Sequence, residues 1–164
     1  MTNQRSWFSP GEGRWLILIR LMLFGVFFFE GIQKLIFPDI LGAGRFAGIG
    51  IPWPEFTGPL VGWFELTCGL LLLFGLFSRL AAVPLIVIMI VAVLSTKVPI
   101  LLGQDWLIFH VRQLDRYGFW SMAHETRTDW AMLLGALYVM LMGGGRWSLD
   151  RLWFGATLAG DQRQ

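Results

Sequence analysis

The stretch TGPLVGWFELTCGLLLLFGLFSRLAAVPLIVIMIVAVLSTKV, residues 57–98, decides the fold. It contains two apolar runs, 57–77 and 80–98. Each is close to the length of about 20 helical residues that cross a bilayer core. Only Ser78 and Arg79 separate the two runs, so the helices must be antiparallel. The sequence therefore predicts a transmembrane helical hairpin in the middle of the chain.

Two further apolar runs flank this hairpin. The first covers residues 14–37 and is followed by Pro38, which interrupts a helix. The last is clearly apolar only from Trp130 to Gly143, and we expect its helix to begin near His124 with a polar first turn buried in protein. The four runs predict an all-α fold: a four-transmembrane-helix bundle with both chain ends on one side of the membrane.

The composition supports a polytopic membrane protein. The 164 residues are 55% hydrophobic and only 15% charged, whereas about 25% of residues are charged in soluble domains. A net charge of +2 provides no basic surface for nucleic acid, so we expect the lipid bilayer as surroundings and no nucleic-acid partner. One cysteine, Cys68, excludes an internal disulfide and is expected to be a packing residue.

The predicted organisation is a polar N-terminal tail (1–13), one membrane domain (14–152) and a C-terminal tail (153–164). Residues 1–13 lack a small-residue cleavage site, so we expect the first helix to be retained. Cations favour the side that carries the ends, and we expect a bacterial-type inner membrane protein with cytoplasmic termini. The cations are Arg5, Arg14, Arg79, Arg146, Arg151 and Arg163 on that side, against Arg45, Lys97, Arg112, Arg116 and Arg127 on the other.

Two long loops, 38–56 and 99–123, lie on the opposite, exoplasmic side in this topology. Pro52 and Pro54 prevent the first loop from forming one regular helix. In the second, apolar residues at rough helical spacing favour an interfacial helix within 106–117. This extended third loop of the chain is also a candidate docking surface for a protein partner.

Charged residues from all four predicted helices gather at the loop side. Ionisable groups within membrane spans are costly and usually face the protein interior. Glu30 and Lys34 are four residues apart and are predicted to form an ion pair on one helix face. Glu65 has no local partner, so its carboxylate would either be protonated or pair with a cation, for which Arg45, Lys34 and Lys97 are the candidates. Two interpretations stay open: structural pairs and ordinary interfacial charge, or a polar pocket.

On the pocket interpretation, Glu30 and Glu65 are the candidate catalytic carboxylates, because a buried carboxyl group can transfer protons. Cations beside them can bind a carbonyl oxygen or an oxyanion. The candidate substrate-binding residues are Lys34, Arg45, Lys97, His124 and Glu125.

Two other features receive structural interpretations. His110 and His124 are the only histidines, and their spacing does not suggest ligation, so no metal or haem is predicted. Arg20 lies about a turn and a half into the first span, and we expect it to snorkel to the cytoplasmic face in a structural or lipid-contact role.

Several short motifs follow one another along residues 14–152. In their order and spacing, the chain resembles the DoxX family of small four-helix membrane proteins. The stretch from Gly103 to Ala123 is longer than is typical of that family. The motifs are Glu30-Gly31-Ile32-Gln33-Lys34-Leu35, Phe46 with Gly50-Ile51-Pro52, Glu65-Leu66 with Gly69 and Gly75, Phe77-Ser78-Arg79-Leu80-Ala81-Ala82, Glu125, and Gly145-Arg146-Trp147-Ser148-Leu149-Asp150.

The resemblance implies a quinone-linked role. The family is named for a subunit associated with a terminal quinol oxidase and thiosulfate:quinone oxidoreductase. The first hypothesis is a redox-associated subunit that binds a quinone, or a similar amphipathic molecule, at the exoplasmic helix ends. The alternative is a non-catalytic assembly or anchor subunit of a larger oxidoreductase complex. Transport is less favoured, because the chain has no inverted repeat and no broken helix at the membrane midplane. Whether the protein is itself an enzyme stays open.

Overall fold

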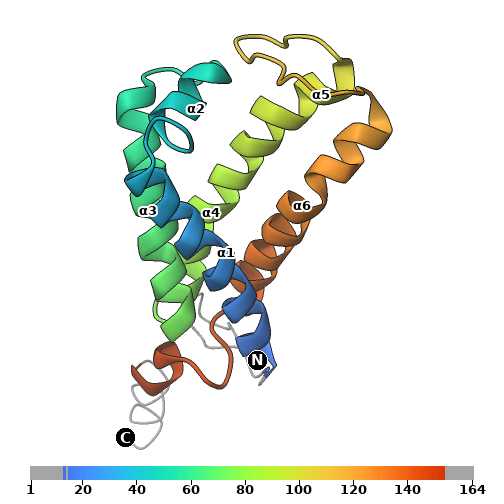
Figure 1. Ribbon diagram of the computed structural model, residues 1–164. Coiled ribbons are helices and arrows are strands. Elements are labelled where there is room, and N and C mark those ends of the chain that lie inside the picture. Colours follow the sequence, from blue (N-terminus) through green and yellow to red (C-terminus); the bar gives the residue numbers. More distant parts are fainter. Residues whose placement is uncertain (1–12, 14, 154–164) are drawn as a thin grey trace, which may run out of the picture.

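The computed structural model describes residue 13 and residues 15–153. The predicted tails, 1–13 and 153–164, fall almost entirely outside these residues. Four long helical segments run along one another, and both ends of the described chain lie at the same end of the molecule (Figure 1). The elements are α1 (Leu16–Ile36), α2 (Ala43–Gly48), α3 (Pro54–Phe74), α4 (Ser78–Ala92), the π-helical turn η1 (Val93–Lys97), α5 (Val98–Leu102) and α6 (Phe119–Met142).

Three of the described segments are long and apolar enough to cross a membrane: α1, α3 and the continuous α4–η1–α5 segment. The predicted helical membrane protein is thus confirmed for three spans. The fourth predicted segment is α6, which has 24 residues and begins at Phe119, earlier than expected. Its first half carries several charged side chains, and α6 therefore does not reach the apolar character of the other three.

The hairpin turn lies a few residues before the predicted one. Helix α3 ends where Gly75 adopts a left-handed conformation (φ 65°), and α4 begins at Ser78. The carboxylate of Asp150, far along the chain, accepts hydrogen bonds from the backbone N–H groups of Phe77 (2.6 Å) and Ser78 (2.9 Å). These bonds satisfy free donors at the start of α4, so a distant residue decides where the helix begins.

The third span is longer than predicted because it does not stop at Val98. Pro99 has no N–H group and cannot hydrogen-bond back to the preceding turn. The backbone accommodates it with the wider turn η1 and then continues as α5 to Leu102. Single π turns of this kind are frequent at functional sites.

The predicted interfacial helix in the loop between α5 and α6 is wrong. Trp106 and Phe109 instead exchange two backbone hydrogen bonds (3.0 and 2.9 Å) across a tight turn. The Asp105 carboxylate then accepts hydrogen bonds from the Val111 N–H (2.8 Å) and from Nδ1 of His110 (3.0 Å). These partners, Val111 first, hold the pKa of Asp105 below its usual value. Such turn and side-chain bonds compete with a helix for the same backbone groups.

The bundle is built from two helix pairs, α1 with α3 and α4 with α6. Glycines allow the first pair to approach closely, as expected for small residues between membrane helices. A Cβ atom on Gly31 of α1 would lie 2.6 Å from the carbonyl oxygen of Gly62 in α3. Gly69 packs in the same way against the backbone of Phe28. Two neighbouring helices are therefore fixed to each other along most of their length.

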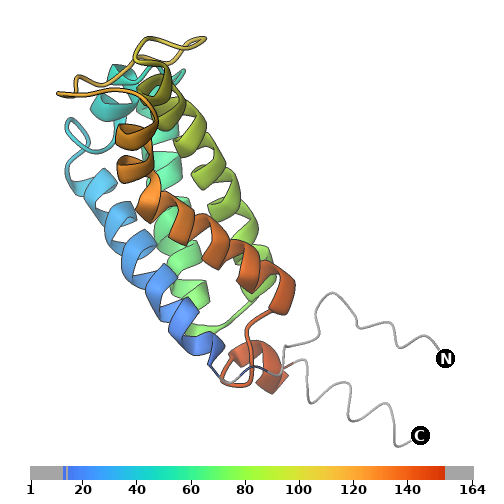
Figure 2. The same cartoon turned by 90° about the vertical axis from the view of Figure 1, so that its right-hand side faces the viewer.

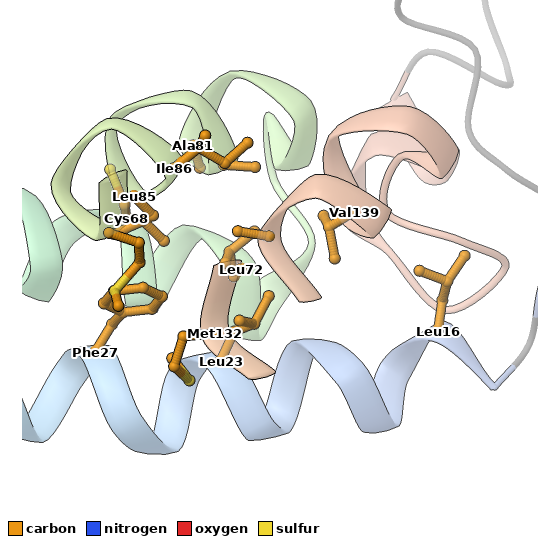
Figure 3. Close-up of a cluster of buried hydrophobic side chains, with 13 residues drawn as sticks. Leu16, Leu23, Phe27, Cys68, Leu72, Ala81, Leu85, Ile86, Met132 and Val139 are labelled. Atoms are coloured by element: carbon orange, nitrogen blue, oxygen red, sulfur yellow. The ribbon is translucent and has the colours of Figure 1, made fainter. Parts of the chain in front are cut away.

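The main hydrophobic core lies toward the end that holds the α3–α4 turn, here called the hairpin end. Side chains from all four long segments meet there (Figure 3). At the opposite end, the loop end, α3 and α4 have separated from each other (Figure 1), and the loop between α5 and α6 lies across the helix ends (Figure 2). The core residues include Leu23 and Phe27 of α1, Cys68 and Leu72 of α3, Leu85 and Met89 of α4, and Met132 and Val139 of α6.

Arg20 does not snorkel, contrary to the prediction, and is only 1% exposed. Its guanidinium donates to the carbonyl oxygens of Leu72 and Leu73 (both 2.6 Å), where α3 ends. It also donates to Gly144 (3.0 Å) and Trp147 (2.6 Å), beyond α6. Carbonyl groups at helix ends have no partner within their own helix. Arg20 thus joins three segments at the hairpin end.

Candidate functional site

A cavity of about 360 Å³ lies toward the loop end, between the two helix pairs. This volume is within the usual range for small-molecule pockets. Every element from α1 to η1 contributes to its wall, together with α6, and most of the wall is apolar. The apolar lining residues include Phe27, Phe46, Val61, Ile88, Met89 and Met132.

Polar residues lie on several sides of this apolar wall. The sequence singled out seven site residues, and five of them line the cavity. Five further lining residues with hydroxyl or carboxylate groups were not selected. The predicted five are Glu30, Lys34, Arg45, Glu65 and Lys97, and the further five are Thr57, Ser95, Thr96, Thr128 and Asp129.

Lys34 lies between the two candidate carboxylates. Its Nζ is 2.7 Å from Oε2 of Glu65 and 3.2 Å from Oε2 of Glu30. Lys34 and Glu65 are buried, whereas about half of the Glu30 side chain is exposed. The predicted pair with Glu30 is present, and of the three candidate cations Lys34 is the one that pairs with Glu65. These three residues connect α1 and α3 through charge-assisted contacts.

Glu65 lies deep in the membrane segment. It follows Pro54, the first residue of α3, by 11 positions, which at 1.5 Å per residue is about 16 Å along the helix. The cavity therefore extends from the loop end to about the middle of α3. Ionisable groups at this depth usually pair with one another, and Lys34 is the partner of Glu65.

The second ion pair connects the π turn with α6. Nζ of Lys97 is 3.0 Å from Oδ2 of Asp129, and both side chains are largely buried. In the same turn, the Thr96 hydroxyl donates to the carbonyl oxygen of Ala92 (2.6 Å). The π turn thus brings Ser95, Thr96 and Lys97 into the cavity wall together.

Arg45 differs from the other lining cations. It lies on the short helix α2 and is exposed, and its guanidinium forms no hydrogen bond or ion pair with another described residue. Its guanidinium can therefore form up to five hydrogen bonds with a bound group. Among the lining cations of the described chain, this one is available without breaking a pair.

The other two predicted site residues, His124 and Glu125, do not line the cavity. His124 is exposed at the start of α6, and Oε2 of Glu125 is 2.8 Å from the Arg112 guanidinium. One helical turn later, Asp129 faces the cavity. The sequence showed the cluster of charges at the start of this helix but not which face turns inward. No group of three metal-ligating side chains occurs among the described residues.

The sequence comparisons agree with this architecture. The DoxX family model matches residues 15–98, which include α1, α3 and α4 and most of the polar lining. The chain belongs to the DoxX family. This DoxX protein is also 48% identical, over 136 residues, to the uncharacterized membrane protein Rv3486 of Mycobacterium tuberculosis. The alignment covers 83% of this chain and 79% of that relative, and no solved structure matches.

Proposed function

We propose that this DoxX protein binds a quinone, or a similar amphipathic small molecule, in the cavity between its helix pairs. The observation that supports this proposal is the cavity itself: apolar walls with buried ion pairs on more than one side. Ligand sites of membrane-soluble molecules combine an apolar lining with a few fixed polar groups. The charged lining residues are three acids, Glu30, Glu65 and Asp129, and three bases, Lys34, Arg45 and Lys97.

The lining residues can perform two tasks for such a ligand. The ammonium and guanidinium groups of Lys34, Lys97 and Arg45 would hydrogen-bond to ring oxygens. Glu30, which is half exposed, and Glu65, which is buried, would exchange protons with them, and Lys34 bridges the two carboxylates. A quinone accepts two electrons and two protons on reduction. The described side chains supply protons only, so the electrons would come from a partner protein or from a second substrate.

We further propose that α6 is a fourth span, that both termini are cytoplasmic and that the cavity lies in the exoplasmic half. Helix α6 is about 36 Å long at 1.5 Å per residue, which is enough to cross the bilayer core. Gln104, in the loop, tests the orientation as Gln104→Cys with Cys68→Ala. We expect an impermeant maleimide to label it in intact cells. Labelling only after permeabilisation would contradict this orientation.

Quinone content tests the function. The protein is purified in mild detergent, extracted and analysed by mass spectrometry, beside Glu65→Gln and a matched control, Glu125→Gln. Glu125 also loses an ion pair in this change, but outside the cavity. We expect near-stoichiometric quinone in the wild type and the control and at least a tenfold loss in Glu65→Gln. Thr57→Val, which removes one lining hydroxyl and no charge, provides a second variant if Glu65→Gln fails to fold.

An assembly or anchor role is the second candidate, because the lining charges largely neutralise one another. Buried ion pairs can serve specificity of packing without any ligand. Folded wild-type protein without quinone would support this role and contradict quinone binding.

A further inference from the structure

The cavity is open toward the bilayer on its α4 side. Val87 and Val91 line the cavity, yet they are 54% and 42% exposed. A side chain that both lines a cavity and remains exposed borders an opening. The opening therefore lies along α4, where this helix faces away from the packed core.

The depth of this opening places it among the lipid chains. Val87 is the tenth residue of the 25-residue segment Ser78–Leu102, about 13 Å from its start at 1.5 Å per residue. Val91 follows one turn later. In a hydrocarbon core about 30 Å thick, both valines lie among lipid chains. Whatever passes between them comes from the bilayer.

The α3–α4 hairpin explains why the opening exists. The two helices share the core at the hairpin end, through Leu72 and Leu85, and then diverge toward the loop end (Figure 1). On α3, Val61 lines the same cavity, whereas Phe64 is turned outward and 42% exposed. The edge of the opening is therefore apolar on both helices.

The loop end is crossed by the backbone of residues 103–118. The N–H of Gly118 donates to the carbonyl oxygen of Ile100 (3.0 Å) at one side. The N–H of His110 donates to the carbonyl oxygen of Ile49 (3.1 Å), a cavity-lining residue, at the other side. The loop thus extends from the α5–α6 side to the α2–α3 connection, above the cavity.

We propose that the cavity is filled sideways from the bilayer, through the opening between α3 and α4. Its ligand would then be a lipid-soluble molecule with a long apolar tail. The head group would reach Lys34 and Glu65, and the tail would leave past Val87 and Val91. This inference rests on the proposed function and narrows its ligand to a tailed quinone.

Bulky side chains at the opening test this route. The double variant Val87→Trp with Val91→Trp narrows the opening, and Val83→Trp is the matched control. Val83 lies one turn earlier on α4, is 40% exposed and does not line the cavity. All proteins are placed in nanodiscs that contain a phospholipid with a diazirine at the end of its acyl chain. We expect photolabel on Met89 and Met132, inside the cavity, to fall at least tenfold in the double variant only.

A quinone measurement in the same nanodiscs separates this inference from the proposed function. We expect decylubiquinone to bind the double variant at least tenfold more slowly than it binds the wild type or Val83→Trp. Cavity labelling without any quinone binding would contradict the proposed function, whereas entry from the bilayer between α3 and α4 would still stand. Quinone binding that is equally fast in all three proteins, or cavity residues that stay unlabelled in the wild type, would overturn the route.

Discussion

The two ends of the bundle use arginine in opposite ways. At the hairpin end, Arg20 is buried and donates four hydrogen bonds to backbone carbonyl oxygens. At the loop end, Arg45 is exposed beside a cavity, and its guanidinium forms no hydrogen bond or ion pair with another described residue. One end is closed by apolar packing and by the hydrogen bonds of Arg20. At the other end the helices α3 and α4 are separated, and charged side chains line part of the cavity. We infer that stability is concentrated at the first end and binding at the second.

The largest effect is expected from Arg20→Met. This change removes four hydrogen bonds from a charged donor to backbone carbonyl oxygens, and hydrogen bonds to charged groups contribute roughly 1.5–3 kcal/mol each. Since such losses are not additive, we expect a loss of at least about 3 kcal/mol in the free energy of unfolding. Unfolding of the detergent-solubilised protein measures it. Arg45→Met should change that free energy by less than about 0.5 kcal/mol. Equal losses in the two variants would remove the contrast between the ends.

A second prediction concerns the close α1–α3 packing. In Gly31→Ala the new Cβ would approach the Gly62 carbonyl oxygen to 2.6 Å, so the helices must move apart. We expect a cost of about 1–3 kcal/mol. Gly25→Ala, on the same helix, meets no atom within 4 Å and is the control. It should be neutral or stabilise by up to about 1 kcal/mol. A neutral Gly31→Ala would show that this contact is not tight.

The Lys97–Asp129 pair gives a smaller effect. Asp129→Asn leaves the Lys97 ammonium buried without its carboxylate, and we expect a loss of about 1–2 kcal/mol. The double variant with Lys97→Met should recover most of that loss, because no unpaired charge remains. A double-mutant cycle on thermal unfolding in detergent measures the coupling. Additive effects would mean that the pair does not couple the third span to α6.

The smallest effect is local, in the loop 103–118. The pKa of Asp105 is lowered in the folded protein, so its contribution is present above the ordinary value of about 3.9 and is lost only as the pH falls below it. Hydrogen exchange of the Val111 amide should therefore keep its protection factor from pH 8 to pH 5. Asp105→Asn should lower the factor throughout this range. A wild-type factor that falls between pH 7 and pH 5 would contradict this assignment.

Hydrophobic run length was sufficient to predict most of the fold. The three spans and the separate helix α6 follow from it, since long apolar runs have few alternatives in a membrane. The turn position was missed because Asp150 determines it through tertiary hydrogen bonds. The end of the third span was missed because the predicted run ended at Val98, whereas the π turn accommodates Pro99 and the helix continues to Leu102. The burial of Arg20 depends on carbonyl groups from two distant segments, which one sequence does not reveal.

The sequence predicted the place of the candidate site, from its cluster of charged residues, but only some of the residues that line it. Charged groups are costly to bury in a membrane span, and this cost singled out Glu30, Lys34 and Glu65. In the structure, Lys34 contacts both carboxylates. In the first half of α6 several charged residues lie close together. The sequence therefore could not show that Asp129, and not Glu125, faces the cavity. Ser95 and Thr96 are uncharged, so a prediction based on charged residues could not select them. It is the π turn that brings them into the cavity wall.

Photolabelling with an azido-quinone that carries an isoprenoid tail, followed by peptide mapping, tests the central claim most directly. The claim is that the open, charged end of the bundle binds the ligand. We expect the label on cavity residues of α3 and α4, such as Val61 and Ile88, and we expect decylubiquinone to compete for it. Label confined to the lipid-facing surface, for example to Trp63, without competition would contradict the claim.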